Sequence, residues 1–219
     1  MNDAQLVAKA VTTHIGDKDA WHRSSGYGER IDLALINAVL SMRARFGRQL
    51  PDGSFNGVRG AVERYRAVHP DVNTEWFETL AAQNEWDLIQ LLGRAKFKGG
   101  KSKAMGIIEA ARAFVAAGLT DKPKLLANPT EAEAAYRSVK GLGPWTFQYF
   151  TMLIGAESVK PDVWIIRFVA HVVGEDIAPE RAFDAVRSAA ELLKAGSSEL
   201  DHAIWAFASS GGLRGLPRA

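Results

Sequence analysis

The chain has 219 residues, of which 47% are hydrophobic, and it contains no cysteine. A chain of this length can bury its own core, so we expect one domain or two subdomains. The lack of cysteine excludes a disulfide scaffold, a thiolate metal site and a cysteine nucleophile. The 27 basic and 25 acidic residues give a formal net charge of +2, so only the placement of charge can indicate a partner.

Helical periodicity dominates the sequence in chain order. In IDLALINAVLSM, which starts at Ile31, apolar residues recur at three- and four-residue steps, as on a buried helix face. Strand-like alternation is scarce, so we expect an all-α protein. The further predicted helices are Gly57–Val68, Asn73–Ala82, Glu85–Leu92, Lys101–Ala117, Thr130–Val139, Pro144–Ile154, Val163–Val173, Pro179–Lys194 and Ser198–Ser209.

Several helix starts and one loop carry recognisable signals. Thr130 precedes Glu133 by three residues, which predicts a capping box. Pro144 and Pro179 stand where a first helical turn tolerates a missing N–H. The stretch Gly47–Gly57 is rich in glycine and is predicted to be a surface loop.

The start of the chain has no basic segment followed by an apolar stretch, so we expect no secretion signal. No later run reaches the roughly 18 apolar residues of a membrane span. We therefore expect a cytoplasmic protein that makes no membrane contact.

Gly141-Leu142-Gly143 links two of the predicted helices, and Pro144 opens the second one. The two glycines allow positive φ and a close approach of backbone N–H groups to a ligand, while Leu142 can anchor the turn in the core. Together with the helix N-terminus, these N–H groups could seat a phosphate oxygen. An ordinary helix–helix turn is the alternative interpretation.

The wider segment resembles the helix-hairpin-helix (HhH-GPD) superfamily of DNA glycosylases. The resemblance depends on Gly141-Leu142-Gly143-Pro144-Trp145-Thr146, on Tyr149-Phe150 and on Lys160-Pro161-Asp162-Val163-Trp164. Its active-site motif looks most like the bacterial 3-methyladenine DNA glycosylase II branch. Fainter similarity at Ala38–Ser41 and Lys101–Ala104 extends it over roughly residues 30–173.

The resemblance makes Asp162 the expected catalytic residue. As an N-glycosidic bond breaks, positive charge develops on the sugar, and a carboxylate can stabilise it and orient or deprotonate the attacking water. An aspartate just before an apolar helical run is also a good N-cap, and that alternative is compatible with catalysis. At the hairpin, the resemblance implies DNA contacts from Lys140, Gly141, Leu142, Gly143 and Thr146.

Bifunctional members of the superfamily carry a Schiff-base lysine two residues after the second hairpin glycine. This chain has Trp145 there. We therefore expect a monofunctional DNA glycosylase that uses water, without AP lyase activity. An alkylated purine is the expected damaged base, because positive charge already weakens its glycosidic bond; oxidised and deaminated bases are the alternatives. The alternative is a non-catalytic helix-hairpin-helix protein that binds DNA structure or damage.

Trp145 and Trp164 are the expected residues of the base pocket, because indole rings stack well on electron-poor bases. Core packing is the alternative for both, and it is the expectation for Tyr149 and Phe150. Asp201 and His202, with Trp205 one turn later, are assigned to capping or packing rather than chemistry.

Basic residues gather in two places. Arg94–Lys103 contains five cations and no acid, and Lys98, Lys101 and Lys103 are predicted to contact the DNA backbone. Arg43, Arg45 and Arg48 follow the first predicted helix, and the resemblance implies that Arg43 fills the gap left by a flipped base. For both groups, solvated surface charge is the alternative.

By resemblance, residues 33–155 form a helical barrel ending in the hairpin, while residues 1–32 and 156–219 form a second helical subdomain carrying Asp162. A DNA-binding cleft is expected between them. No iron–sulfur cluster or catalytic metal is expected; a monovalent cation at the hairpin is the one ion that the resemblance allows. The expected partner is double-stranded DNA with a damaged base, bound by a nucleoid-associated monomer.

Overall fold

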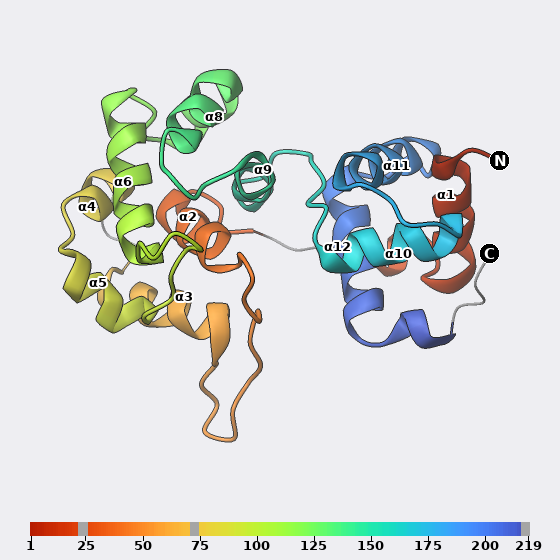
Figure 1. The fold of residues 1–219 in the computed structure, drawn as a ribbon, viewed down its shortest axis with the longest axis horizontal. Helices are drawn as coiled ribbons and strands as arrows, with labels where there is room; N and C mark the ends of the chain where they lie inside the picture. The colour runs from red at the N-terminus through yellow and green to blue at the C-terminus, as the bar shows by residue number, and fades with distance from the viewer. Residues whose placement is uncertain (22–25, 71–74, 216–219) are drawn as a thin grey trace. The chain divides into compact units, whose positions relative to one another are not determined.

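The computed structural model describes residues 1–21, 26–70 and 75–215. Over these ranges the protein has twelve α-helices and two short 3-10 helices, η1 (Lys18–Ala20) and η2 (Gly212–Gly215), and no strand (Figure 1). Isolated β-bridges join Gln49 to Phe55 and Lys96 to Ser102. The prediction of an all-α protein is confirmed.

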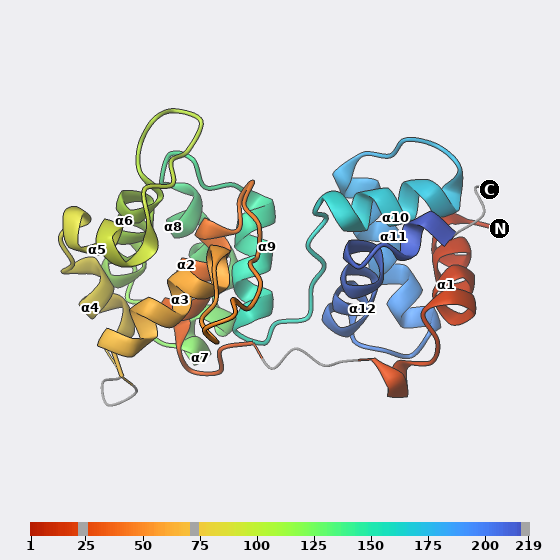
Figure 2. The ribbon, with the colours of Figure 1, turned by 90° about the horizontal axis from the view of Figure 1, so that it is seen from below.

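The helices belong to two compact units (Figures 1 and 2). The internal unit is Gly26–Gly155, and the terminal unit combines Met1–Ser25 with Ala156–Ala219. The predicted boundary between residues 32 and 33 falls inside a helix, so residues 26–32 belong with the internal unit. The amide of Tyr27 donates to the carbonyl of Leu153 at 2.9 Å, which ties the start of this unit to its end.

The internal unit surrounds one central helix, α2 (Ile31–Leu40), all ten residues of which are buried. It packs against α3, α4, α6 and α9, and Figure 2 shows it among them. Eight residues of α2 are apolar because neighbours cover its faces, and the other two, Asp32 and Asn37, are buried polar residues. The other helices of the unit are α3 (Gly57–Val68), α4 (Trp76–Ala81), α5 (Glu85–Leu92), α6 (Lys103–Ala116), α7 (Lys122–Ala127), α8 (Pro129–Arg137) and α9 (Pro144–Leu153).

Aromatic rings from four helices fill the core of the internal unit. Phe77 stacks on Phe114 at 4.8 Å between ring centroids, and Tyr136 stacks on Phe150 at 6.1 Å. All four side chains are fully buried. Phe150 is thus a core residue, as predicted, and Tyr149 is half-buried against the same core. This packing holds α8 and α9, the two helices of the predicted hairpin, on the rest of the unit.

The terminal unit consists of α1 (Asp3–His14), α10 (Val163–Val173), α11 (Pro179–Leu192) and α12 (Ser197–Ser209). Helices α10, α11 and α12 pack on one another, and α1 packs on α10 and α11. Val7, Phe168, Val186 and Ile204, one from each helix, are fully buried in its core. A segment before α10, residues 156–162, leads into this core.

Some local predictions were wrong. Helices α1 and α7 were not predicted; α7 has only six residues, too few to show a period. The capping box of Thr130 and Glu133 is absent because α8 begins one residue earlier, at Pro129, and Glu133 pairs with Arg137 at 3.0 Å. The predicted helix Asn73–Ala82 is described from Trp76 on, and its first two residues lie outside the described ranges.

Candidate functional site

The turn between α8 and α9 has the sharp geometry that the glycines predict. Gly141 has φ +105°, in the region that favours glycine, whereas Gly143 has φ −128° and extended backbone. The expectation of positive φ therefore holds for only one of them. Leu142 is 7% exposed and packs in the core of the internal unit, so it anchors the turn.

Helix α9 starts at Pro144 without a side-chain cap from the residue before it. Gly143 has no side chain, Pro144 has no N–H, and the first turn contains no acidic residue. Thr146 tightens the turn instead, since its hydroxyl donates to the carbonyl of Gly143 at 2.8 Å. This N-terminus presents the positive end of the helix dipole without an acid of its own.

Phe97 brings the predicted basic loop against the hairpin. A Cβ added at Gly141 would lie 2.9 Å from the Phe97 ring, and one added at Gly106 of α6 would lie 2.5 Å from it. The ring thus packs on two glycines, one in the hairpin and one in α6. The sequence contains only one sign of this contact, namely that Phe97 is the single aromatic residue of the basic loop.

Lys103 does not reach solvent, so its predicted DNA contact is wrong. Its ammonium donates to the carbonyl of Leu40 at 2.9 Å and to that of Met42, at the C-terminal end of α2. The residue is 5% exposed, and burial lowers the pKa of its amine. Carbonyls that end a helix need donors, and a lysine can supply them. Lys103 therefore fixes the base of the α2–α3 connection.

The other predicted cations of the internal unit lie at its surface. Lys98 and Lys140 are exposed, while Lys101 is half-buried and forms an ion pair with Glu109 of α6. The sequence of the loop contains no acid, but the fold supplies one. Lys98 follows Phe97 in the chain, and Lys140 precedes Gly141, on which the Phe97 ring packs.

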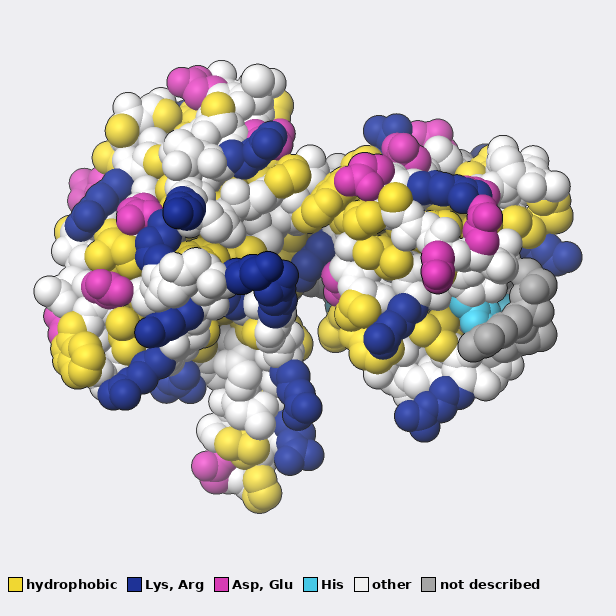
Figure 3. Space-filling view, viewed as in Figure 1, with side chains coloured by type: hydrophobic (Ala, Val, Ile, Leu, Met, Phe, Trp, Pro, Cys, Tyr) yellow, Lys and Arg dark blue, Asp and Glu magenta, His cyan; other side chains and the backbone are white. Residues whose placement is uncertain are grey.

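The α2–α3 connection extends away from the helices as an arm, residues 43–56 (Figure 1). Its two sides are joined by hydrogen bonds, including Leu50 N to Ser54 O at 2.7 Å and Asn56 N to Arg48 O at 3.2 Å. The predicted residues Arg43 and Arg45, like Arg48, are exposed. Figure 3 shows dark blue side chains along one edge of the arm, whose basic residues are all arginines.

Asp162 occupies a tightly determined position in the terminal unit. Its Oδ1 accepts hydrogen bonds from the amides of Trp164 at 2.8 Å and Ile165 at 3.2 Å, so it is the N-cap of α10. Its own amide donates to the carbonyl of Lys160 at 2.7 Å, which closes a three-residue turn around Pro161. None of the described hydrogen bonds uses Oδ2. The capping alternative is thus correct, and it fixes the carboxylate in place.

A second carboxyl lies behind this turn. Asp201 of α12 accepts from the amide of Lys160 at 2.9 Å and is 8% exposed. Burial, and to a lesser degree the negative charge of Asp162, raise its pKa to about 8, while Lys160 acts in the opposite direction. Burial also lowers the pKa of the Lys160 amine. Asp201 lies 39 residues after Asp162 in the chain and on another helix, so sequence periodicity gave no reason to connect the two carboxyls.

The two predicted pocket tryptophans occupy equivalent places on different helices. Trp145 is the second residue of α9, Trp164 is the second residue of α10, and both are half-buried. The guanidinium of Arg167 lies 5.3 Å from the centre of the Trp164 ring. Of the predicted site residues, Asp162 and Trp164 belong to the terminal unit, and all the others belong to the internal unit.

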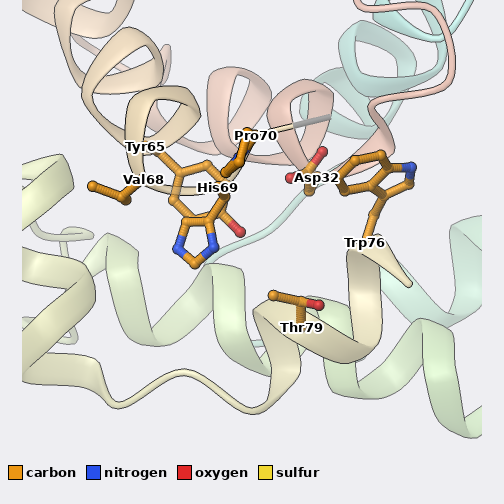
Figure 4. A pocket seen from close by; sticks show the side chains of 7 residues that line it. All are labelled: Asp32, Tyr65, Val68, His69, Pro70, Trp76 and Thr79. Carbon is orange, nitrogen blue, oxygen red and sulfur yellow. The ribbon is translucent and has the colours of Figure 1, made fainter. Parts of the chain in front are cut away.

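The internal unit also contains a pocket of about 120 Å³ between α2, α3 and α4 (Figure 4). The carboxylate of Asp32 in its wall is paired with Arg30 at 2.9 Å, and Arg30 lies 4.2 Å over the ring of Trp76. Tyr65 and His69 stack at 4.3 Å in the opposite wall. Neither predicted pocket tryptophan lines it. Asp32 lies in the first turn of α2 and Lys103 binds its other end, so the pocket and the basic arm lie at opposite ends of this helix.

Two searches of the described residues complete the description. None of the helices in residues 1–21, 26–70 and 75–215 is long and apolar enough to cross a membrane. Within the same ranges, no group of three or more His, Asp or Glu side chains could hold a metal ion. The monovalent cation at the hairpin stays a prediction.

Comparison with known proteins identifies the family but not an activity. Residues 5–209 match the model of a family described as a domain of unknown function (DUF8548), so the chain belongs to that family. Searches of curated proteins and of solved structures found no match.

Proposed function

We propose that this protein is a monofunctional DNA glycosylase of the helix-hairpin-helix type, which excises a damaged base from double-stranded DNA. The observation that carries the proposal is the fixed carboxylate of Asp162, held by two helix amides and by the turn around Pro161. A carboxylate held so closely costs little reorganisation when charge develops beside it. The relationship to the glycosylase superfamily is part of the proposal.

In the proposed reaction, the bond between the sugar C1′ and the base nitrogen breaks, and the base leaves with the electron pair. Asp162 stabilises the resulting positive charge on the sugar and accepts a proton from the water whose oxygen then bonds to C1′. A positively charged alkylated purine leaves as a neutral base, so no acid is required. This chemistry favours an alkylated purine as the substrate.

The internal unit supports the DNA-binding half of the proposal. The uncapped N-terminus of α9 suits a phosphate oxygen. Lys140, just before the turn, and Lys98, next to the Phe97 ring that packs on Gly141, are exposed and add positive charge. Arg43, Arg45 and Arg48 of the arm add positive charge. Such contacts give affinity without sequence preference, as expected of an enzyme that searches for damage.

Excision from a panel of duplexes, each with one damaged base, tests this function. The wild type is expected to form abasic sites on an alkylated-purine duplex, and Asp162→Asn is expected to bind the same duplex without cleaving it. Asp184→Asn, an exposed carboxylate on α11, is the matched control and should retain activity. If no duplex is cleaved but DNA affinity is normal, the protein is a DNA-binding module instead.

Borohydride trapping tests the use of water rather than a lysine. Because Trp145 stands where bifunctional relatives have lysine, we expect no covalent adduct. Lys160 is the lysine nearest to Asp162 in the chain, and its amine has a lowered pKa. If an adduct forms, the monofunctional assignment is wrong, and Lys160→Arg shows whether this amine formed it.

A further inference from the structure

We propose that Asp201 is a positioning residue that holds the Asp162 carboxylate in its working place. The inference rests on the proposed glycosylase function and adds a residue from a different helix, 39 positions later in the chain, to the site. Asp201 acts through the backbone of Lys160 and need not touch the DNA.

The backbone of Lys160 is held at both of its polar groups. Its amide donates to the Asp201 carboxyl at 2.9 Å, and its carbonyl accepts from the Asp162 amide at 2.7 Å. Asp162 in turn caps α10. Asp201 is therefore connected to the catalytic candidate through one residue and two short hydrogen bonds, so a shift of its carboxyl would move the turn.

Helix α12 holds the whole segment that leads to Asp162. Glu157 accepts from the amide of Ser198 at 3.0 Å, and the Ser198 hydroxyl accepts from the amide of Ser158 at 3.0 Å. One turn later on the same helix, Asp201 makes the last of these contacts. Val159, between them, is fully buried in the core of the terminal unit. Among these contacts, the one from Asp201 is closest to Asp162.

The charge state of Asp201 suits a positioning role. Burial keeps its carboxyl largely protonated near neutral pH, so Asp162 does not face a second full negative charge. Lys160 and Asp162, both on the segment packed against α12, are the charged groups that act on it. A neutral carboxyl closely resembles the amide of asparagine, which can accept the same hydrogen bond.

This resemblance provides the test, with two substitutions that differ in one property. Asp201→Asn keeps an oxygen for the Lys160 amide, whereas Asp201→Ala removes it. We expect Asp201→Ala to slow single-turnover excision of an alkylated purine by about 10- to 100-fold while DNA affinity changes less than about twofold. Asp201→Asn should retain the rate within about threefold. Ser198→Ala is the matched control, because it loosens the segment one helical turn away.

A second measurement does not depend on excision. Hydrogen exchange of the Trp164 and Ile165 amides reports whether Asp162 still caps α10. Their protection should fall in Asp201→Ala and survive in Asp201→Asn and Ser198→Ala. Unchanged protection in Asp201→Ala, or excision at the wild-type rate, overturns the inference. If the wild type excises nothing, the proposed function fails, and the exchange data alone decide whether Asp201 positions Asp162.

Discussion

Helices α9 and α10 begin in similar sequences but present opposite charge. A proline stands beside each N-cap, since Pro144 is the first residue of α9 and Pro161 precedes Asp162. Each helix has a tryptophan as its second residue. The N-cap of α9 is Gly143, which contributes no side chain, while the N-cap of α10 is Asp162, whose carboxylate occupies two amides. The first end can attract an anion from outside, and the second already contains its own.

In the proposed function, this difference separates two tasks that one site could not perform. An open helix N-terminus favours the DNA backbone, whereas a carboxylate repels phosphate but stabilises a cationic sugar. In this protein the open end belongs to the internal unit with the basic arm, and the acidic end belongs to the terminal unit with Asp201. Substitutions that make one end resemble the other can therefore test each task alone.

The largest expected effect comes from removing the charge at α10. Asp162→Asn can still accept the capping hydrogen bonds but cannot stabilise a cation. We expect excision to fall by 100-fold or more, with little change in the melting temperature or in DNA affinity. Single-turnover kinetics on an alkylated-purine duplex measures the effect. Loss of DNA affinity instead of rate would assign Asp162 to binding.

The carboxyl behind α10 predicts a pH dependence of stability. The pKa of Asp201 is about 8 in the folded protein against an ordinary value of 3.8, so the folded state retains a proton that the unfolded state has lost. The free energy of unfolding should therefore fall as pH rises between these values, by up to about 1.4 kcal/mol per pH unit. Asp201→Asn should remove this contribution. Urea denaturation from pH 4 to 8 gives the slope of the free energy of unfolding against pH for the wild type and for Asp201→Asn. Identical slopes in the two proteins would contradict the raised pKa of Asp201.

Adding a carboxylate to α9 should weaken DNA binding by about tenfold, because it places negative charge where phosphate is expected. Gly143→Asp fits sterically, since its φ is −128° and a Cβ there would meet nothing within 4 Å. Gly143→Asn has the same shape without the charge and serves as the control. Fluorescence anisotropy with a labelled duplex measures both variants. Equal affinities at low salt would exclude α9 as a phosphate site.

The smallest expected effect concerns Lys98, the exposed cation that follows Phe97 in the chain. Lys98→Ala should weaken DNA binding a few-fold and reduce the slope of log affinity against log salt by about 0.9 if it neutralises one phosphate. Lys124→Ala, an exposed lysine on α7 of the same unit, should change neither. A salt titration of both variants gives the slopes. An unchanged slope in Lys98→Ala would remove this lysine from the proposed interface.

Local signals predicted most of the fold and part of the candidate site. Periodicity located helices such as Gly57–Val68 and Val163–Val173 with their exact bounds, since each places apolar residues on one face. Asp162 as an N-cap also followed from its position before an apolar run. The inward direction of the Lys103 side chain did not follow from the sequence, because a lysine in a basic loop is ordinarily solvated. In the fold, the nearby end of α2 offers carbonyls to its ammonium.

The sequence by itself determined that the protein is helical and where its turns lie, because helix periods and caps depend on neighbouring residues. It also placed a glycine turn and an aspartate at the starts of two helices. Only the tertiary structure decided which charges remain available: it paired Lys101 with Glu109, buried Lys103 and brought Asp201 to Lys160. These contacts join residues 8 to 63 positions apart, and their energies depend on burial, which a local pattern does not encode.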